Sequence, residues 1–500
     1  MVFLGVDMGT SGCKAVIFDE SWNMVCQAYR EYPTHFPGGG LMEIEPELVW
    51  KNIREVIREV NGKTDEAVTA LAVSAIGDVI IPLDQDGNCH RTYAIIDFDP
   101  RGGEEIAQFV EEFGKEAFYQ INGMPPLFIG SLAKILWIRE NEPEIFEKTA
   151  RWGTFEDFIV QKLGLPPIAS YSELSRTMLF DIRKKAWSEE ICKKVPISMD
   201  KLPAAAKSGS RAGMLSQEMC EELGFPKPVL VAVGGHDMVC SAVGAGLDEK
   251  EPATAVDIAG TIEGVVATLK ECNTSMELCD QAFPCYIGYE DYVTFSVNLT
   301  AGCITRWYRD QIVPDDYAMC KEKGLNFYEY MQRTMDEKEP GSLFLLPHFS
   351  GSGNPFFDAG ARGAIYGLTT DTERADIGRA LVEGLAYEVK MQLEAYEKAG
   401  IHIDTLRAVG GGSAIDRQLQ LKANITGKRI IKCSMTEGAA MGAAVYAAIA
   451  QGVMKHPGEI KRYIDGKEKI FVPDPESTEK FEKSYETYRK LAYGIHEMEQ

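Results

Sequence analysis

Short apolar runs alternate with amphipathic stretches along most of the chain, a pattern typical of α/β proteins. The first apolar run, residues 3–8, passes through a turn of glycine, threonine and serine into a second apolar run, so the two predict a β-hairpin. Further along, apolar positions recur at helical spacing or fill a continuous run. They predict a buried strand over 67–75 and helices over 45–60, 103–113 and 131–140.

The same hairpin pattern occurs a second time. About 250 residues further on, residues 253–267 again read as strand, Gly-Thr turn and strand, which is expected of an internal duplication. A charged turn with a proline, residues 246–252, immediately precedes this second copy and is the best domain boundary. We therefore predict an N-terminal domain over 1–246, a C-terminal domain over 253–452 and a helical tail over 453–500 that packs on the outside.

The length and net charge of the chain limit the number of domains and the kinds of partner that we expect. A chain of 500 residues exceeds what one hydrophobic core usually supports, which agrees with two domains. The formal net charge of −23 argues against nucleic acid and against anionic membranes as partners. Any bound polyphosphate must therefore be held by local donors.

The cysteines and the start of the chain bear on location. The twelve cysteines include no C-x-x-C pair, and their spacing is not that of a zinc site, so we expect reduced thiols. The chain begins with a strand pattern rather than a secretory signal, and no run of about 18 apolar residues occurs. These features predict a cytoplasmic protein.

The first hairpin turn has the residues that grip a phosphate. Glycines let backbone N–H groups approach an anion, hydroxyls add donors and a lysine adds charge; these residues are Gly9, Thr10, Ser11 and Lys14. Asp7 can hold a hydrated Mg²⁺ ion beside them. A purely structural hairpin would have the same pattern, and the spacing is neither that of a Walker loop nor that of a dinucleotide fingerprint.

The second turn, with Gly260 and Thr261, strengthens the phosphate interpretation. Two such hairpins that face each other would hold the phosphates of a nucleotide from both sides. One copy alone would be a weaker signal.

An acid stands between the two hairpins in the sequence. Asp237 follows a buried strand, residues 229–235, and precedes a helix of small residues. A carboxylate at such a place can orient an attacking hydroxyl and finally accept its proton. The alternative is that Asp237 only caps the helix, which is compatible with catalysis. For His236, a buried structural role and donation to a substrate are equally good interpretations.

Over about residues 1–450 the chain resembles the FGGY family of carbohydrate kinases. The pieces that carry the resemblance occur in family order, at residues 7–11, 131–137 with 142–144, 234–237, 260–261, 363–368 with 379–384, and 410–413. The resemblance implies an α/β fold of two ribonuclease-H-like (actin-like ATPase) domains around a central cleft. It also implies ATP as phosphoryl donor with Mg²⁺, Asp237 as the catalytic residue, and dimers as a frequent assembly, so it allows a homodimer.

The piece at 410–413 looks like the adenosine motif of that family. A turn without Cβ atoms lets adenine and ribose lie against the backbone, and the residues that would do so are Gly411, Gly412 and Ser413. Alternatively, these glycines serve only close helix packing. The small residues at 439–443 are more simply interpreted as a tightly packed helix face.

The expected substrate positions depart from the family pattern. The resemblance places sugar contacts after the strand over 67–75 and in a W-x-D-x-R-like segment, which correspond here to Gly77, Asp78, Asp97, Asp99 and Arg101, together with the catalytic turn at His236 and Asp237. Xylulose kinases of the common bacterial type carry Met-His at the first two positions and glycerol kinases carry Arg-Glu. Both usually have tryptophan where this chain has Asp97.

Gly-His-Asp at 235–237, combined with Gly-Thr-x-Glu at 260–263, is similar to a fuculose-kinase-like branch. Whether Glu263 contacts the substrate stays open. The family resemblance therefore indicates a ketose or polyol kinase without naming the sugar.

Charge at the sugar end favours a neutral substrate. Asp78, Asp97, Asp99 and Asp237 offer several carboxylates, whereas Arg101 is the one fixed cation that we expect there. We therefore predict ATP-dependent phosphorylation of a hydroxyl on a neutral ketose such as xylulose, or on a polyol, over gluconate or glycerol. A non-catalytic sugar or nucleotide sensor would have no need of Asp237. An actin-like ATPase or chaperone would lack the segments at 131–137 and 97–101.

Overall fold

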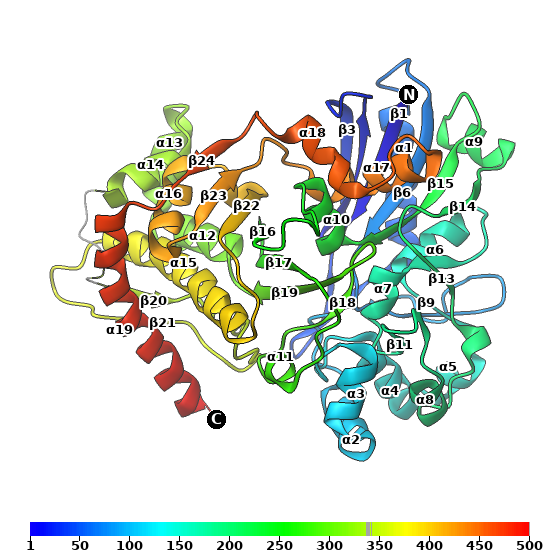
Figure 1. The fold of residues 1–500 in the computed structure, drawn as a ribbon, viewed down its shortest axis with the longest axis horizontal. Helices are drawn as coiled ribbons and strands as arrows, with labels where there is room; N and C mark the ends of the chain where they lie inside the picture. Colours follow the sequence, from blue (N-terminus) through cyan, green and yellow to red (C-terminus); the bar gives the residue numbers. More distant parts are fainter. Residues whose placement is uncertain (337–340, 342, 500) are drawn as a thin grey trace.

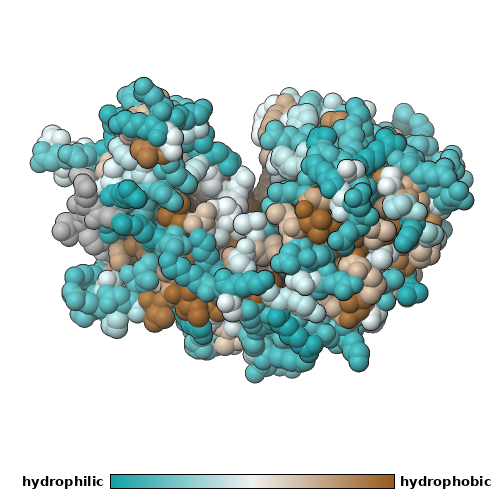
Figure 2. Space-filling view, turned by 90° about the horizontal axis from the view of Figure 1, so that it is seen from above, coloured by the Kyte–Doolittle hydropathy of each residue, from teal (hydrophilic) through white to brown (hydrophobic). Residues whose placement is uncertain are grey.

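The computed structural model describes residues 1–336, 341 and 343–499, which form two α/β halves, each built on a mixed sheet (Figure 1). The first sheet has six strands in the order β14-β15-β6-β1-β2-β3. Their bounds are Arg211–Met214, Leu230–His236, Val68–Ala75, Val2–Met8, Gly12–Phe18 and Met24–Glu31. The space-filling view from above shows the surface hollowed between two lobes (Figure 2).

The second sheet has seven strands in the order β18-β19-β17-β16-β22-β23-β24. Their bounds are Tyr286–Ile287, Tyr292–Asn298, Glu263–Leu269, Thr254–Ala259, Thr405–Val409, Arg429–Lys432 and Lys469–Phe471. Strand β16 pairs antiparallel with β17 and parallel with β22, just as β1 pairs antiparallel with β2 and parallel with β6. The fold is thus the duplicated, actin-like ATPase type expected from the sequence.

Helices flank the two sheets. Those of the first half are α1 Pro46–Asn61, α2 Gly103–Phe113, α3 Lys115–Asn122, α4 Ser131–Asn141, α5 Pro143–Lys148, α6 Phe155–Lys162, α7 Tyr171–Ser175, α8 Glu189–Lys194, α9 Gln217–Leu223 and α10 Asp237–Gly244. Those that follow are α11 Met276–Asp280, α12 Gly302–Trp307, α13 Pro314–Glu322, α14 Phe327–Asp336, α15 Arg374–Lys398, α16 Asp416–Thr426, α17 Gly438–Gln451, α18 Lys461–Ile464 and α19 Pro475–Glu499. Within the described ranges, no helix is both long and apolar enough to cross a membrane.

Short strand pairs complete the two halves. They are β4 His35–Gly38 with β5 Leu41–Ile44 and β8 Ala94–Ile95, β7 Ile81–Leu83 with β9 Arg151–Gly153, β10 Ile168–Ser170 with β13 Ala204–Ala206, β11 Phe180–Asp181 with β12 Ala186–Trp187, and β20 Phe344–Leu346 with β21 Ala364–Tyr366. All twelve cysteines are free thiols.

Helices α10 and α17 cross where small residues let their backbones meet. A Cβ on Gly442 would lie 1.9 Å from the carbonyl oxygen of Cys240, and one on Gly5 of β1 would lie 1.8 Å from that of Ala440. The small residues of α17 therefore serve tight packing, as the sequence indicates. Because α17 packs on β1 and β6, the predicted C-terminal domain, 253–452, contributes a helix to the first half.

The end of the chain is more than a helical tail. Strand β24 extends the second sheet at the edge of β23, with Phe471 opposite Ile430 and buried. Only then does α19 begin, and it packs against α16 and α15. The prediction of a purely helical tail over 453–500 is wrong here, because a three-residue strand leaves too short a pattern to recognise.

Candidate active site

Hydrogen bonds hold the backbone of the β1–β2 turn, while the tip of the turn is exposed to solvent. The Gly9 N–H donates to the Gly12 carbonyl over 3.0 Å, and the Tyr32 hydroxyl lies 2.5 Å from the Gly9 carbonyl oxygen, to which it donates. Thr10 and Ser11 are exposed at the tip. Their donors are accessible to an anion, which fits the predicted phosphate turn.

Lys14 is not a free cation. Its ammonium group forms an ion pair with the carboxylate of Glu437, the residue directly before α17. The pair ties the phosphate turn to the helix that crosses α10. A phosphate at this turn would share Lys14 with Glu437, a partner that the local sequence pattern does not reveal.

Asp7 lies near the end of β1, beside Ser74 of β6, whose hydroxyl donates to its Oδ1 over 3.2 Å. Burial raises the pKa of Asp7 to about 6, while Ser74 and Lys14 act in the opposite direction. The negative charge of Asp7 also helps to raise the pKa of Asp237. Two neighbouring carboxyl groups in a cleft are the oxygen donors that Mg²⁺ prefers, so the residues present fit such an ion.

Asp237 is the first residue of α10, directly after β15, and its side chain is 30% exposed. Burial, followed by the charges of Asp7, Asp97 and Asp78, raises its pKa to about 8. A carboxyl group perturbed in this way, in a cleft, is typical of a proton-accepting residue.

His236 is a buried, neutral partner of Asp237. Burial, together with the charge of Arg176, holds the pKa of His236 well below its ordinary value. Its Nε2 lies 3.2 Å from Oδ1 of Asp237, and its Nδ1 lies 3.3 Å from the hydroxyl of Tyr286. A neutral ring satisfies both contacts if Tyr286 donates to Nδ1 and Nε2–H donates to Asp237. Tyr286, from the second sheet, is a residue that sequence reasoning missed.

Arg176 is the main residue that the sequence analysis did not find. It is 1% exposed, and its Nη2 and Nε lie 2.5 and 3.1 Å from Oδ2 of Asp78. The guanidinium also lies over the rings of Tyr286 and Phe295 from the second half. Its signal in the sequence is weak: it is an arginine directly before the largely apolar run 177–180, where a buried cation requires an acid partner.

The turn at Gly77 and Asp78 is shaped by this arginine. A Cβ on Gly77 would lie 2.8 Å from Cδ2 of His236 and 3.0 Å from Cγ of Arg176, so only glycine fits between them. Asp78 adopts a left-handed backbone with φ of 67°, which an aspartate tolerates better than most residues. The turn therefore packs directly against His236 and Arg176.

Asp78 and Asp97 each present an unused acceptor. The Oδ1 atoms of both are buried and have no hydrogen-bond partner among the described residues. Burial, then the charge of Asp78, raises the pKa of Asp97 to about 7. Both acids also raise the pKa of Asp237. The structure therefore brings Asp78, Asp97 and Asp237 together, at the positions expected for a sugar.

Asp99 and Arg101 are used inside the protein. Arg101 donates through Nε and Nη2 to the buried carboxylate of Asp99, over 2.8 and 2.6 Å, and its Nη1 lies 2.9 Å from Glu43. Lys134 binds the backbone carbonyls of both residues. Asp99 and Glu43 thus pair with Arg101, so it is not the unpaired cation that the sequence leads us to expect at the sugar end; that Asp99 and Arg101 contact the substrate stays a prediction.

The second hairpin turn is exposed at its tip. The N–H of Gly260 donates to the carbonyl of Ile262 over 2.8 Å, and Gly260 and Thr261 are accessible. Behind the turn, Lys422 of α16 lies 2.5 Å from each of Asp257 and Glu263. The buried Glu263 is therefore part of an ion-pair network that supports the hairpin.

The turn at 410–413 follows β22 and lies against the end of β16. Gly410 has φ of 89°, and a Cβ there would lie 2.5 Å from the carbonyl oxygen of Ala259. The Ser413 hydroxyl donates to the Gly410 carbonyl over 2.7 Å, whereas Gly411 and Gly412 are exposed. An open glycine backbone beside the second hairpin suits a nucleoside, while Ser413 acts within the turn.

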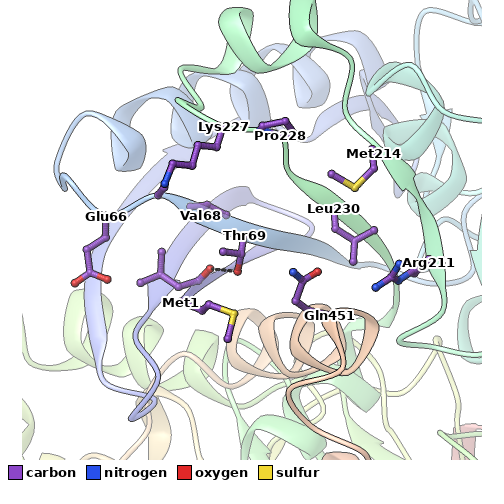
Figure 3. A pocket seen from close by; sticks show the side chains of 12 residues that line it. Met1, Glu66, Val68, Thr69, Arg211, Met214, Lys227, Pro228, Leu230 and Gln451 are labelled. Atoms are coloured by element: carbon purple, nitrogen blue, oxygen red, sulfur yellow. Dashed lines mark hydrogen bonds between the residues drawn. The ribbon is translucent and has the colours of Figure 1, made fainter.

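A pocket of about 560 Å³ lies elsewhere, at the beginning of β1 and β6 (Figure 3). Its lining includes Met1, Val68, Arg211, Lys227 and Gln451, and no predicted site residue is among its lining residues. Because the candidate acids follow the other ends of the same strands, this pocket is separate from the active site.

The same sheet arrangement occurs twice, and each copy begins with a hairpin whose turn is exposed. A carboxylate lies at the start of the helix between the two copies. These features define a phosphotransferase of the actin-like ATPase fold. The N-terminal domain of the FGGY family of carbohydrate kinases matches residues 2–244, and the C-terminal domain of that family matches residues 255–451. The chain belongs to this family and is a carbohydrate kinase.

Its relatives include kinases for different acceptors. The chain is 27% identical to a xylulose kinase of Bacillus subtilis, over 98% of this chain and 96% of that protein, and 28% identical to a glycerol kinase of Clostridium botulinum, over 91% of each. Among solved structures, xylulose kinase and gluconate kinase from Lactobacillus acidophilus both superpose with a TM-score of 0.88 at 21% identity, over 99% of this chain and 98% of theirs. These structures confirm the fold.

Proposed function

We propose that the protein transfers the γ-phosphoryl group of ATP to a hydroxyl of a neutral ketose or polyol, with xylulose as the first candidate acceptor. The observation that carries the proposal is the cluster of Asp237, Asp78 and Asp97 beside the first phosphate turn. The sequence relatives that act on xylulose and glycerol support this class of acceptor. The cytoplasmic location and the homodimer stay predictions.

In the proposed reaction, Asp237 orients the acceptor hydroxyl and takes its proton. The hydroxyl oxygen forms a bond to the γ-phosphorus while the bond from that phosphorus to the bridging oxygen of ADP breaks. The exposed turns at Thr10 and Thr261 would hold the phosphates, and the neutral His236 fixes Asp237 through Nε2–H. Asp7 would hold Mg²⁺, which neutralises phosphate charge when bound.

The acceptor is expected to be neutral. Arg176 is already paired with Asp78, and Lys134 donates to the backbone carbonyls of Asp99 and Arg101, so neither cation is free to bind a substrate carboxylate. The buried Oδ1 atoms of Asp78 and Asp97, by contrast, have no hydrogen-bond donor among the described residues and can accept from substrate hydroxyls. ADP release should be compared across ketopentoses, ketohexoses, polyols, glycerol and aldonates. We expect the highest kcat/KM with a ketose or polyol; the highest value with gluconate would contradict the charge argument.

Activity should depend on Mg²⁺ through Asp7. Replacing Asp7→Ala removes a carboxylate from the proposed ion site, so the Mg²⁺ concentration needed for half-maximal activity should rise by about tenfold or more. A Mg²⁺ titration at saturating ATP measures this change. An unaltered titration curve would exclude Asp7 from metal binding.

The pH profile should report the raised pKa of Asp237. The base must be ionised, so kcat/KM for the acceptor should fall as pH decreases through the pKa of about 8 and on through the neutral range. Because the charge of Asp97 helps to raise that pKa, Asp97→Asn should move this limb to lower pH. Profiles of the two proteins at one fixed Mg²⁺ concentration would settle the point, and coincident limbs would contradict the coupling.

A further inference from the structure

The strand that leads to Asp237 is irregular just before the catalytic turn. Between β15 and β6, Ala232 pairs with Ala72, but Gly235 pairs with Ser74, so β15 contains one extra residue. Such a bulge re-aims the residues that follow it. A Cβ on Gly234 would lie 1.7 Å from the carbonyl oxygen of Val73, so the strands approach here more closely than any side chain allows.

A buried carboxylate takes up the backbone group that the bulge releases. Glu156 of α6 is fully buried, and its Oε1 accepts the N–H of Gly234 over 2.8 Å. Its Oε2 accepts the N–H and the hydroxyl of Ser170 over 2.9 and 2.7 Å. Three donors converge on this carboxylate, so the ionised form is the one that satisfies them all, although burial raises the pKa of Glu156 to about 7.

The same network reaches the residue before Asp237. The backbone N–H of His236 donates to the hydroxyl of Ser172 over 3.1 Å, and that hydroxyl lies 3.0 Å from the hydroxyl of Ser170. Because Ser170 gives its proton to Glu156, the consistent direction runs from His236 N–H to Ser172, then to Ser170, then to Glu156. Both N–H groups on either side of Gly235 are thus held by one buried acid.

We infer that Glu156 is a positioning residue for phosphoryl transfer: through Gly234 directly and through Ser170 and Ser172, it holds the β15 bulge that aims Asp237 at the acceptor hydroxyl. This inference rests on the proposed role of Asp237. A displacement of about 1 Å in a reacting group can lower the rate by about 100-fold, so the network should act on turnover rather than on nucleotide binding.

The chain offers matched controls for two variants. Glu156→Gln replaces one carboxylate oxygen by an NH₂ group, which cannot accept the N–H that the oxygen accepted. The control Asp157→Asn changes the neighbouring buried acid, which caps α6 and pairs with Arg151 but makes no hydrogen bond to the bulge. Ser172→Ala removes the acceptor of His236 N–H. The control Ser175→Ala removes a hydroxyl of the same helix that donates to the backbone carbonyl of Tyr171. Each pair compares the same chemical change inside and outside the network.

The experiment measures kcat and KM by ADP release, with whichever of D-xylulose, D-fructose, xylitol and glycerol the unmodified enzyme turns over fastest, together with the Kd of ADP and the Tm. We expect Glu156→Gln and Ser172→Ala to lower kcat by about 10- to 100-fold, with the Kd of ADP within about twofold, while both controls keep kcat. Equal kcat in each pair would overturn the inference.

A variant that fails to fold must be distinguished from one that folds but turns over slowly. If Glu156→Gln does not fold, the inference is tested by comparing the kcat of Ser172→Ala with that of Ser175→Ala. If neither network variant folds while both controls do, the network serves folding and the inference is wrong. Retained activity in Asp237→Asn would instead refute the proposed function, whereas an inactive Asp237→Asn with an unaffected Ser172→Ala would refute only the positioning role.

Discussion

Replacing Asp237→Asn should lower kcat by about 10²- to 10⁴-fold, the range typical of losing a general base, while the Kd of ADP stays within about twofold. The amide keeps the size of the side chain and can still accept a hydrogen bond from His236, so the acceptor stays oriented. It cannot accept the hydroxyl proton at the end of the transfer. Steady-state ADP release and ADP binding, measured on the same preparation, separate the two effects.

The matched control is Asp86→Asn, which makes the same chemical change at an exposed position in a turn. It should keep full activity and the same Tm. The Asp237→Asn variant should also lose the acid limb of the pH profile that the unmodified enzyme shows, because that limb reports the ionisation of Asp237. Activity close to that of Asp86→Asn would remove Asp237 from the mechanism.

Sequence reasoning placed the backbone features of this site because they have local signatures. The strand–turn–strand pattern occurs twice, and Asp237 follows a continuous apolar run, so the topology carries these residues to equivalent ends of the two sheets. The resemblance to a kinase family predicts the sugar end near Gly77 and Asp97, and this location stays a prediction. Periodicity and family order were sufficient for this level of the structure.

The charge partners could not be predicted, because they join residues far apart in the chain. Arg176 meets Asp78 across 98 residues, Lys14 meets Glu437 across 423, and Lys422 meets Asp257 across 165. Arg101 belongs to the W-x-D-x-R-like segment and is expected from the sequence to be a free cation, yet Asp99 and Glu43 form ion pairs with it. The sign of the field at a site depends on such pairings, which no local pattern records.

The Lys422 network leads to the second large expected effect, on stability. Lys422→Met should destabilise the protein by about 3–5 kcal/mol, because it leaves the buried acids Asp257 and Glu263 without their cation. These two strand residues lie directly behind the Gly260 turn, so nucleotide binding should weaken as well. Urea unfolding gives the first effect, and ADP titration gives the second.

The loss should grow with pH. Burial already raises the pKa of Glu263 to about 7, with Lys422 acting against it. Without the lysine, the folded state holds Glu263 at a pKa further above that of the unfolded chain, so it binds more protons and loses stability as pH rises. We therefore expect a smaller loss at pH 5 than at pH 8. Lys469→Met, which breaks an exposed pair with Asp416, should cost no more than about 1 kcal/mol and show no such trend. If the two variants prove equally stable at pH 8, the buried network does not support the second phosphate hairpin.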